Sequence, residues 1–233
     1  SDLIQHELDG FRDVMVSSGI AGMNLALIFH EVVHSIDTIS RKLGDGTVIE
    51  DVRNEINHLR KLLDTFKPLL QRDPARKVSS EDLVSRAVGM HEDRFERHSV
   101  VLSNWTSDPK KSQNFSVMMP RGLMVGAVSN VIDNAIYWSR YRKERDKLQN
   151  PAAILVLSAW TEESGNLLIV VDNGPGFQLP EDQFARPFMS TRAGGMGLGL
   201  FYCKTVMETI GGKLDIVNAD VLRDIIDIPT AYD

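Results

Sequence analysis

The stretch from Val170 to Leu200 decides the fold class of this chain. It begins Val170-Val171-Asp172-Asn173-Gly174-Pro175-Gly176-Phe177 and ends Gly194-Gly195-Met196-Gly197-Leu198-Gly199-Leu200. The apolar run before Asp172 predicts a buried strand that ends at a single carboxylate. The second glycine cluster directly precedes an apolar pattern of helical period, so its amides and the helix N-terminus could hold phosphate. Its spacing fits neither the P-loop nor the dinucleotide-binding fingerprint, so we expect a nucleotide pocket of another kind.

The carboxylate of Asp172 could accept a hydrogen bond from the exocyclic amine of adenine. Gly174 and Gly176 would let the backbone approach the base closely. The same residues also fit an ordinary Asp-Asn-Gly turn, and the glycines of 194–199 also fit a flexible loop.

A second polar pattern lies upstream, where Asn130 and Asn134 stand four residues apart and therefore on one face of a helix. Asparagine is unfavourable inside helices, so the pair needs a reason. An amide oxygen is a ligand that Mg²⁺ accepts between phosphate oxygens. The alternative is a pair of solvent-facing asparagines.

Composition places the chain among globular proteins: it has 233 residues, 42% of them hydrophobic, and a formal net charge of -6. The acidic balance argues against nucleic acid as a partner. The single cysteine, Cys203, and the absence of a signal-peptide pattern or a long apolar run favour a cytoplasmic protein or the cytosolic part of a larger one. Membrane attachment would then need segments absent from this sequence.

The N-terminal part predicts two helices. Apolar residues alternate by three and four from Leu8 to Leu43 and again from Val52 to Leu70, with the turn Gly44-Asp45-Gly46 between them. We expect an antiparallel helical hairpin that buries its apolar seam against a second copy, as a four-helix bundle in a homodimer.

The pattern changes near residue 75, where we place the domain boundary. We expect a helix capped by Ser79 that runs to about Arg97, and further helices over 121–145 and 198–210. Strands are expected at 100–105, 115–119, 153–160, 167–171, 213–217 and 221–228. The sequence therefore predicts an α/β domain with helices on one face of a mixed sheet.

Four motifs in this order carry a family resemblance: Asn130-x-x-x-Asn134, Asp172-x-Gly174-x-Gly176, Phe184-x-x-x-Phe188 and Gly195-x-Gly197-x-Gly199. They resemble the N, G1, F and G2 boxes of the GHKL ATPase superfamily, most closely those of sensor histidine kinases. The resemblance implies an α+β chain. Residues 1–75 would be the dimerisation and histidine-phosphotransfer hairpin, and 76–233 the GHKL (Bergerat-type) ATP-binding α/β sandwich.

The resemblance also implies site residues. Asn134 would hold Mg²⁺, Asp172 would bind adenine, and residues 178–196 would form a mobile lid. Arg192 in this lid could neutralise phosphate charge, and the alternative is a solvated arginine. Asn130 would belong to the catalytic set. The remaining nucleotide-binding residues would be Gly174, Gly176, Phe188, Gly195, Gly197, Leu198 and Gly199.

In the first helix, His30-Glu31 resembles the H box of the family, whose histidine accepts the γ-phosphoryl group. An imidazole can act as a nucleophile when a neighbouring carboxylate orients it or takes its proton, which would be the role of Glu31. His34, one turn later, is a rival acceptor. His30 to His34 also reads His-Glu-x-x-His, the zinc-protease pattern, but a heptad seam offers neither a third ligand nor a catalytic domain.

The chain departs from the family pattern at three places. No Pro follows His30 within the H box, Tyr137 stands where a Lys is frequent, and the last strand lacks its glycine-rich entry. The resulting prediction is an ATP-dependent protein-histidine kinase that phosphorylates itself and passes the phosphoryl group to an Asp of a response regulator. The alternatives are a GHKL ATPase that drives a conformational cycle, whose members typically carry Glu at the position of Asn130, and a dimeric nucleotide-binding scaffold without phosphoryl transfer.

Overall fold

A computed structural model describes residues 32–39, 41–42, 49–70, 73–177, 183, 185–193, 195–223, 226–229 and 232. Four residues of the predicted motifs lie outside this set. They are His30, Glu31, Phe184 and Gly194.

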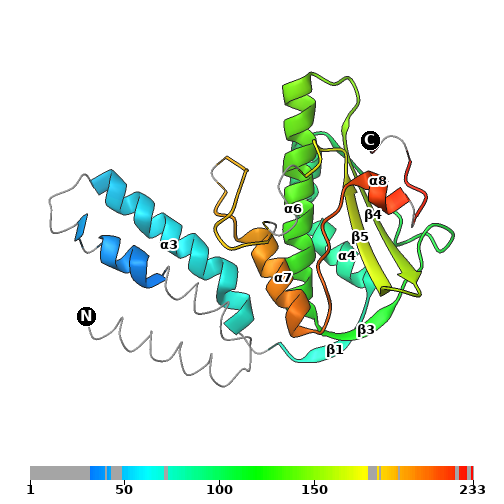
Figure 1. Ribbon diagram of the computed structural model, residues 1–233, viewed down its shortest axis with the longest axis horizontal. Coiled ribbons are helices and arrows are strands. Elements are labelled where there is room, and N and C mark those ends of the chain that lie inside the picture. Colours follow the sequence, from blue (N-terminus) through cyan, green and yellow to red (C-terminus); the bar gives the residue numbers. More distant parts are fainter. Residues whose placement is uncertain are drawn as a thin grey trace.

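The hairpin region contains helical residues 32–39 and 41–42, followed by α3 (Ile49–Leu70) (Figure 1). Glu50 and Asp51 lie in the first turn of α3, where negative charge complements the helix dipole. Lys42 and Glu55 form an ion pair of 3.7 Å that joins the two helical segments. Val32 and Leu62 are buried in an apolar cluster that also contains residues of the following α/β domain. The boundary near residue 75 and the four-helix bundle stay predictions.

The α/β part of the chain begins with a strand that its sequence pattern did not predict. β1 (Ala75–Ser79) pairs antiparallel with β3 (Ser116–Pro120). Only one of its five residues, Val78, is fully buried, so β1 lacks the apolar alternation from which strands are recognised.

The predicted helix from Ser79 to Arg97 is two helices, which corrects that expectation. α4 (Ser80–Gly89) is capped as predicted, because the Asp82 amide donates to Ser79 Oγ at 3.1 Å. The chain then turns at Met90 and His91 and resumes as α5 (Glu92–Arg97). The buried His91 side chain is directed to α6 (Arg121–Asp146), where its Nε2 lies 2.8 Å from Ser129 Oγ, and this contact fixes the break.

A three-stranded mixed sheet forms the centre of the domain, in the order β2 (Val100–Asn104), β4 (Ala152–Thr161), β5 (Gly165–Asp172). β2 runs parallel to β4, and β4 runs antiparallel to β5. The mixed sheet and the adjacency of β4 and β5 are confirmed.

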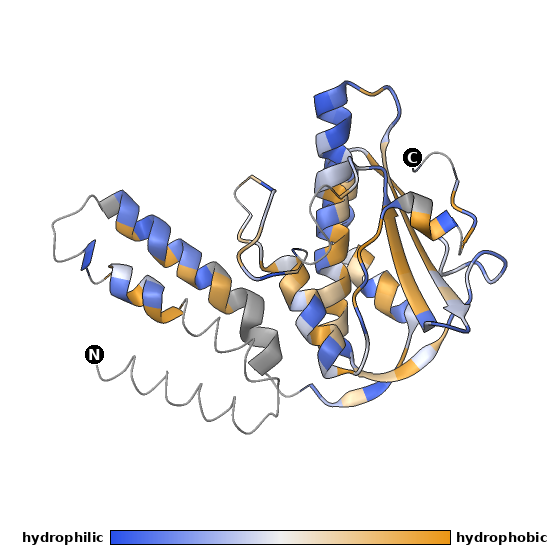
Figure 2. Cartoon of the chain, viewed as in Figure 1, coloured by the Kyte–Doolittle hydropathy of each residue, from blue (hydrophilic) through white to orange (hydrophobic). Residues whose placement is uncertain are grey.

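Alternate residues of β4 face two apolar clusters. Ile154 and Val156 belong to the cluster formed with α4, α6 (Arg121–Asp146) and α7 (Gly199–Thr209). Leu155 and Leu157 belong to a second cluster on the opposite face, which the C-terminal residues Ile228 and Tyr232 cover. Figure 2 shows this apolar interior and the polar last turns of α6. The layered α/β architecture follows from this division.

The predicted strands at 213–217 and 221–228 are not observed. Residues 212–218 carry no regular structure, and α8 (Ala219–Arg223) follows them. Leu222 and Ile226 are four residues apart, and both pack on the second apolar cluster. The Ile226 amide donates to the Leu222 carbonyl at 2.9 Å. Residues four apart share one face in a helix and in a strand alike, so their spacing could not decide between the two.

Among the residues that the structure describes, no helix has the length and apolar composition needed to cross a membrane.

Candidate functional site

The two asparagines of α6 and the second glycine cluster meet in the fold. A Cβ placed on Gly199, the first residue of α7, would lie 3.2 Å from Asn130 Oδ1 and 3.9 Å from Asn134 Nδ2. Asn130 Nδ2 donates to the Gly126 carbonyl at 3.0 Å. This bond directs the amide oxygen of Asn130 towards the N-terminus of α7. The structure thus brings the predicted catalytic amide and the predicted phosphate-binding helix start into contact.

Asp172 ends β5, as its strand pattern predicted. Its Oδ1 accepts the Gly174 amide at 2.8 Å. Burial raises the pKa of Asp172 to about 6, and the Gly174 amide offsets part of that rise. A largely buried carboxyl group that has no charged partner among the described residues is available to a polar ligand group.

The space around Gly174 is too small for a residue with a side chain. A Cβ there would lie 2.4 Å from Asp172 Oδ1 and 3.0 Å from Trp138 Cβ, so no larger residue fits. Gly176 adopts a φ of +73°, which favours glycine. The sequence assigns both glycines to close approach of the backbone to adenine, and that role stays a prediction.

Two residues that the sequence reading did not select hold the turn after β5. Asn173 is buried, accepts the Ala153 amide at 2.9 Å and donates to the Pro151 carbonyl at 3.0 Å. Arg142 of α6 donates to the carbonyls of Asn173 and Gly174 at 3.1 and 3.2 Å. Their contacts are long-range, so no local sequence signal identified them.

The loop before α7 folds back on its own backbone. Gly197 has a φ of +68°, and a Cβ there would lie 2.5 Å from the backbone nitrogen of Met189. A Cβ on Gly195 would lie 2.6 Å from Ser190 Oγ. Leu198 is buried in the core, so its side chain does not face the site and only its backbone could contact a ligand. Phe188 is 36% exposed.

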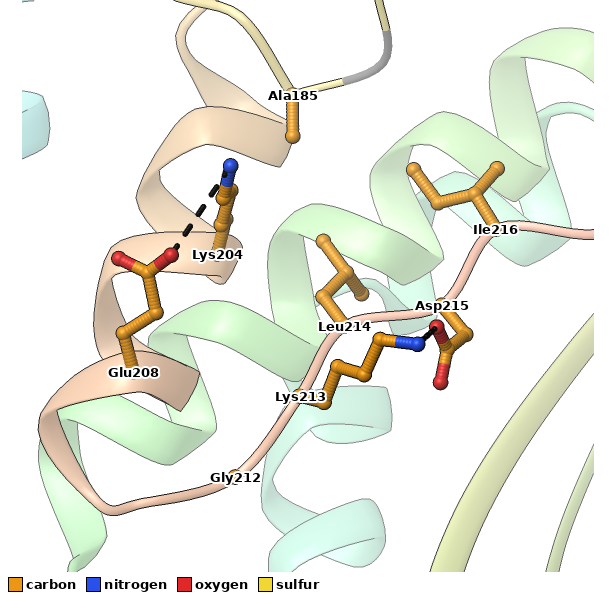
Figure 3. Close-up of a pocket in the computed structure, with 8 residues that line it drawn as sticks. All are labelled: Ala185, Lys204, Glu208, Gly212, Lys213, Leu214, Asp215 and Ile216. Atoms are coloured by element: carbon orange, nitrogen blue, oxygen red, sulfur yellow. Dashed lines mark ion pairs between the residues drawn. The ribbon is translucent and has the colours of Figure 1, made fainter. Parts of the chain in front are cut away.

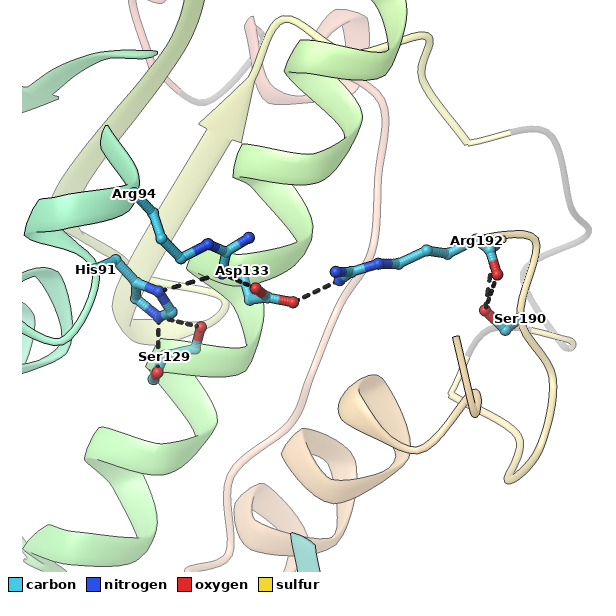
Figure 4. Close-up of polar contacts among 6 residues, drawn as sticks. All are labelled: His91, Arg94, Ser129, Asp133, Ser190 and Arg192. Atoms are coloured by element: carbon cyan, nitrogen blue, oxygen red, sulfur yellow. Dashed lines mark hydrogen bonds and ion pairs between the residues drawn. The ribbon is translucent and has the colours of Figure 1, made fainter. Parts of the chain in front are cut away.

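A charged network connects this loop to α6 and α5, as Figure 4 shows. Asp133, between the two asparagines of α6, forms ion pairs with both Arg192 and Arg94. Burial alone would raise the pKa of Asp133, but the hydrogen bonds from Arg192 and Arg94 outweigh it and hold that pKa below its usual value. Arg192 also lies over the Tyr137 ring, 4.4 Å from its centre. Sequence reasoning proposed Arg192 but missed Asp133 and Arg94.

The histidine region is only partly described. His34 lies on the exposed side of its helical segment, and His30 and Glu31 lie outside the described residues. Within the described part of the chain, no group of three or more His, Cys, Asp or Glu side chains is arranged to hold a metal ion.

A separate cavity of about 280 Å³ lies between α7 and residues 212–216 (Figure 3). Ala185 of the predicted lid lines it, and none of the predicted nucleotide-binding, metal-binding or catalytic residues does. Its lining consists of Ala185, Lys204, Glu208, Gly212, Lys213, Leu214, Asp215 and Ile216.

A protein-family model matches the part of the chain that contains the candidate site. Residues 121–225 match the model of the family described as histidine kinase-, DNA gyrase B- and HSP90-like ATPase. This segment contains α6, β4, β5 and α7 and all four predicted boxes. The resemblance to the GHKL superfamily and to the catalytic cores of sensor histidine kinases is thereby confirmed.

Individual relatives point to the same kind of protein. The chain is 33% identical over 121 residues to the sensor protein SrrB of Staphylococcus aureus (strain NCTC 8325 / PS 47), which covers 48% of this chain and 18% of SrrB. It is 33% identical over 90 residues to the autoinducer 1 sensor kinase/phosphatase LuxN of Vibrio campbellii, which covers 38% of this chain and 10% of LuxN. The matches thus span less than a fifth of these relatives.

A solved structure supports the fold over nearly the whole chain. The crystal structure of the histidine kinase ThkA in complex with the response regulator TrrA aligns with a TM-score of 0.50 and 18% identity, over 91% of this chain and 61% of that one. The predicted order of a helical part followed by a mixed-sheet α/β domain is confirmed for the described residues.

Proposed function

We propose that this chain is an ATP-dependent protein-histidine kinase core that phosphorylates its own His30 and then passes the phosphoryl group to an Asp of a response regulator. The observation that carries the proposal is Asn130, whose amide oxygen is directed at Gly199 where α6 meets α7. An amide cannot take a proton from water, so this position favours transfer to another nucleophile over hydrolysis.

The residues at the site fit ATP. Asp172 offers a carboxyl group to the adenine amine, and the Gly174 amide holds that carboxyl group in place. The N-terminus of α7 and the turn at Gly197 present backbone amides to phosphate. Asn134 lies partly exposed on the same face of α6 as Asn130, and its amide oxygen suits Mg²⁺. Bound Mg²⁺ would neutralise charge on the transferred phosphoryl group.

In the proposed reaction, a ring nitrogen of His30 attacks the γ-phosphorus of ATP. The bond between that phosphorus and the β,γ-bridging oxygen breaks, and ADP leaves. The proton of the attacking ring passes to Glu31, which also orients the imidazole. Arg192 stabilises the charge of the phosphate oxygens. A homodimer formed through the hairpin would supply the site with its histidine from the same or the partner subunit.

Incubation with γ-labelled ATP and Mg²⁺ tests the proposal. We expect acid-labile label on the wild type and on His34→Ala, and none on His30→Ala. His58→Ala on α3 is a matched control that removes a histidine from the other helix of the hairpin. Label that survives in His30→Ala would overturn the acceptor assignment. ATP binding without label on any protein would favour the scaffold, and phosphate release without label would favour the hydrolase.

A further inference from the structure

Asp133, Arg94 and Arg192 form a charged network beside the candidate nucleotide site. Asp133 lies on α6 between Asn130 and Asn134, and it is shared by two arginines from different parts of the chain. The three side chains are partly buried, with exposures of 28% for Arg94, 29% for Asp133 and 31% for Arg192. Their pairing is therefore less screened by solvent than that of a surface ion pair.

The side chain of Arg94 also contacts His91, which is itself bound to α6. Its Nη1 lies 3.4 Å from His91 Nδ1, and His91 Nε2 contacts Ser129 Oγ at 2.8 Å and the Ser129 carbonyl at 3.1 Å. For Nδ1 to accept from Arg94, the ring must be neutral with its proton on Nε2, which then donates to Ser129. Burial and the charge of Arg94 lower the pKa of His91, in agreement with a neutral ring. His91 thus holds the Arg94 guanidinium beside Asp133.

Arg192, unlike Arg94, lies in an exposed loop. It belongs to the loop 185–193, where Phe188 is 36% and Met189 is 47% exposed. Its amide donates to Ser190 Oγ at 3.1 Å within the loop, and its guanidinium reaches across to Asp133 and the Tyr137 ring on α6. These contacts tie the loop to the face that carries both site asparagines.

The charges at this face do not balance. Within this network, two guanidinium cations share one carboxylate, so the three side chains together carry a charge of +1. Arg192 can therefore leave Asp133 without stranding a partly buried carboxylate, because Arg94 remains paired with it. An incoming polyphosphate offers Arg192 a more strongly charged partner than one carboxylate does.

We propose that Asp133 and Tyr137 restrain the loop 185–193 in the nucleotide-free protein by holding Arg192, and that the phosphates of ATP compete with Asp133 for this arginine. Arg94 is the positioning residue that makes the exchange possible. The competition with ATP rests on the proposed function, whereas the restraint of the loop does not.

Hydrogen–deuterium exchange of peptides that cover 185–193, without nucleotide, tests the restraint. Asp133→Asn should speed exchange by about threefold to tenfold, the order expected for losing one partly buried ion pair. Tyr137→Leu should do the same, and Tyr137→Phe should not, because it keeps the ring face. Asp146→Asn, which removes an exposed aspartate paired with Arg145 on the same helix, is the control. Unchanged exchange in both Asp133→Asn and Tyr137→Leu would overturn the restraint.

ATP titration by calorimetry tests the competition. Asp133→Asn should tighten ATP binding by about threefold to tenfold, because a larger fraction of the protein has Arg192 available. Arg94→Gln should act in the opposite direction and weaken ATP binding, since Asp133 would then depend on Arg192 alone.

A double-mutant cycle separates this effect from the simple removal of a negative charge near phosphate. In an Arg192→Gln background, Asp133→Asn should no longer tighten ATP binding. An equal gain in both backgrounds would overturn the competition. If the wild type does not bind ATP, the proposed function fails, while the exchange experiment still decides whether the loop is restrained.

Discussion

Replacement of Asp172 by Asn should stabilise the nucleotide-free protein in a pH-dependent way. Burial raises the pKa of Asp172 from 3.8 to about 6, so the folded state binds the proton more tightly than the unfolded state does. The stability that this group contributes is fully present below pH 3.8 and is lost as the pH rises through 6. At roughly 1.4 kcal/mol per pKa unit, the loss reaches about 3 kcal/mol. This is an upper value, because the side chain keeps some contact with solvent.

Urea unfolding of the wild type and Asp172→Asn at pH 5 and pH 8 measures this effect. An Asn oxygen can still accept the Gly174 amide, so the variant changes charge with little change in shape. The free energy of unfolding of Asp172→Asn, relative to that of the wild type, should rise by about 1–2 kcal/mol from pH 5 to pH 8. Other titrating groups cancel in the comparison, since both proteins carry them. A stability difference that is the same at pH 5 and pH 8 would refute the reasoning about Asp172.

Three further predictions concern the fold. Ser79→Ala removes the cap of α4 and should lower the free energy of unfolding by about 1 kcal/mol; an equal loss in Ser85→Ala, on the exposed side of the same helix, would argue against a capping effect. Leu155→Ala should cost about 2–5 kcal/mol in urea unfolding, because the side chain is fully buried against the C-terminal segment; a loss near zero would mean that this face is loosely packed. The Cys203 thiol is buried, and burial raises its pKa to about 12. It should therefore react with iodoacetamide at pH 8 only under denaturing conditions, and rapid labelling of the native protein would contradict its burial.

The sequence predicted those parts of the fold that local patterns encode. The buried strands β4 and β5 and the helices α6 and α7 have continuous apolar patterns, and their bounds agree with the expected ones within a few residues. The Ser79 cap was predicted because a hydroxyl followed three residues later by an acidic residue is a local signal. Asn130 and Asn134 could be placed on one helix face from their spacing alone, and Gly199 was found beside them.

The features that the sequence did not predict depend on distant partners. β1 is held by its pairing with β3 and not by its own apolar residues. The break between α4 and α5 depends on His91 and its contact with Ser129, 38 residues away. Asp133 and Arg94 form their ion pair across 39 residues, and nothing in either local sequence marks it. The C-terminal segment read as strand because an apolar residue every four positions fits both a strand and a helical turn.

The turn between α4 and α5 also limits how the length of the chain can vary. The His91 carbonyl accepts hydrogen bonds from the amides of Arg94 and Phe95. The His91 ring contacts Ser129 of α6. One residue inserted after His91 would rotate the rest of α5 by about 100° relative to α6. Arg94 would then no longer point at Asp133. We therefore expect insertions and deletions to be excluded from this short surface turn, although the exposed hairpin turn at Glu162–Ser164 should accept them.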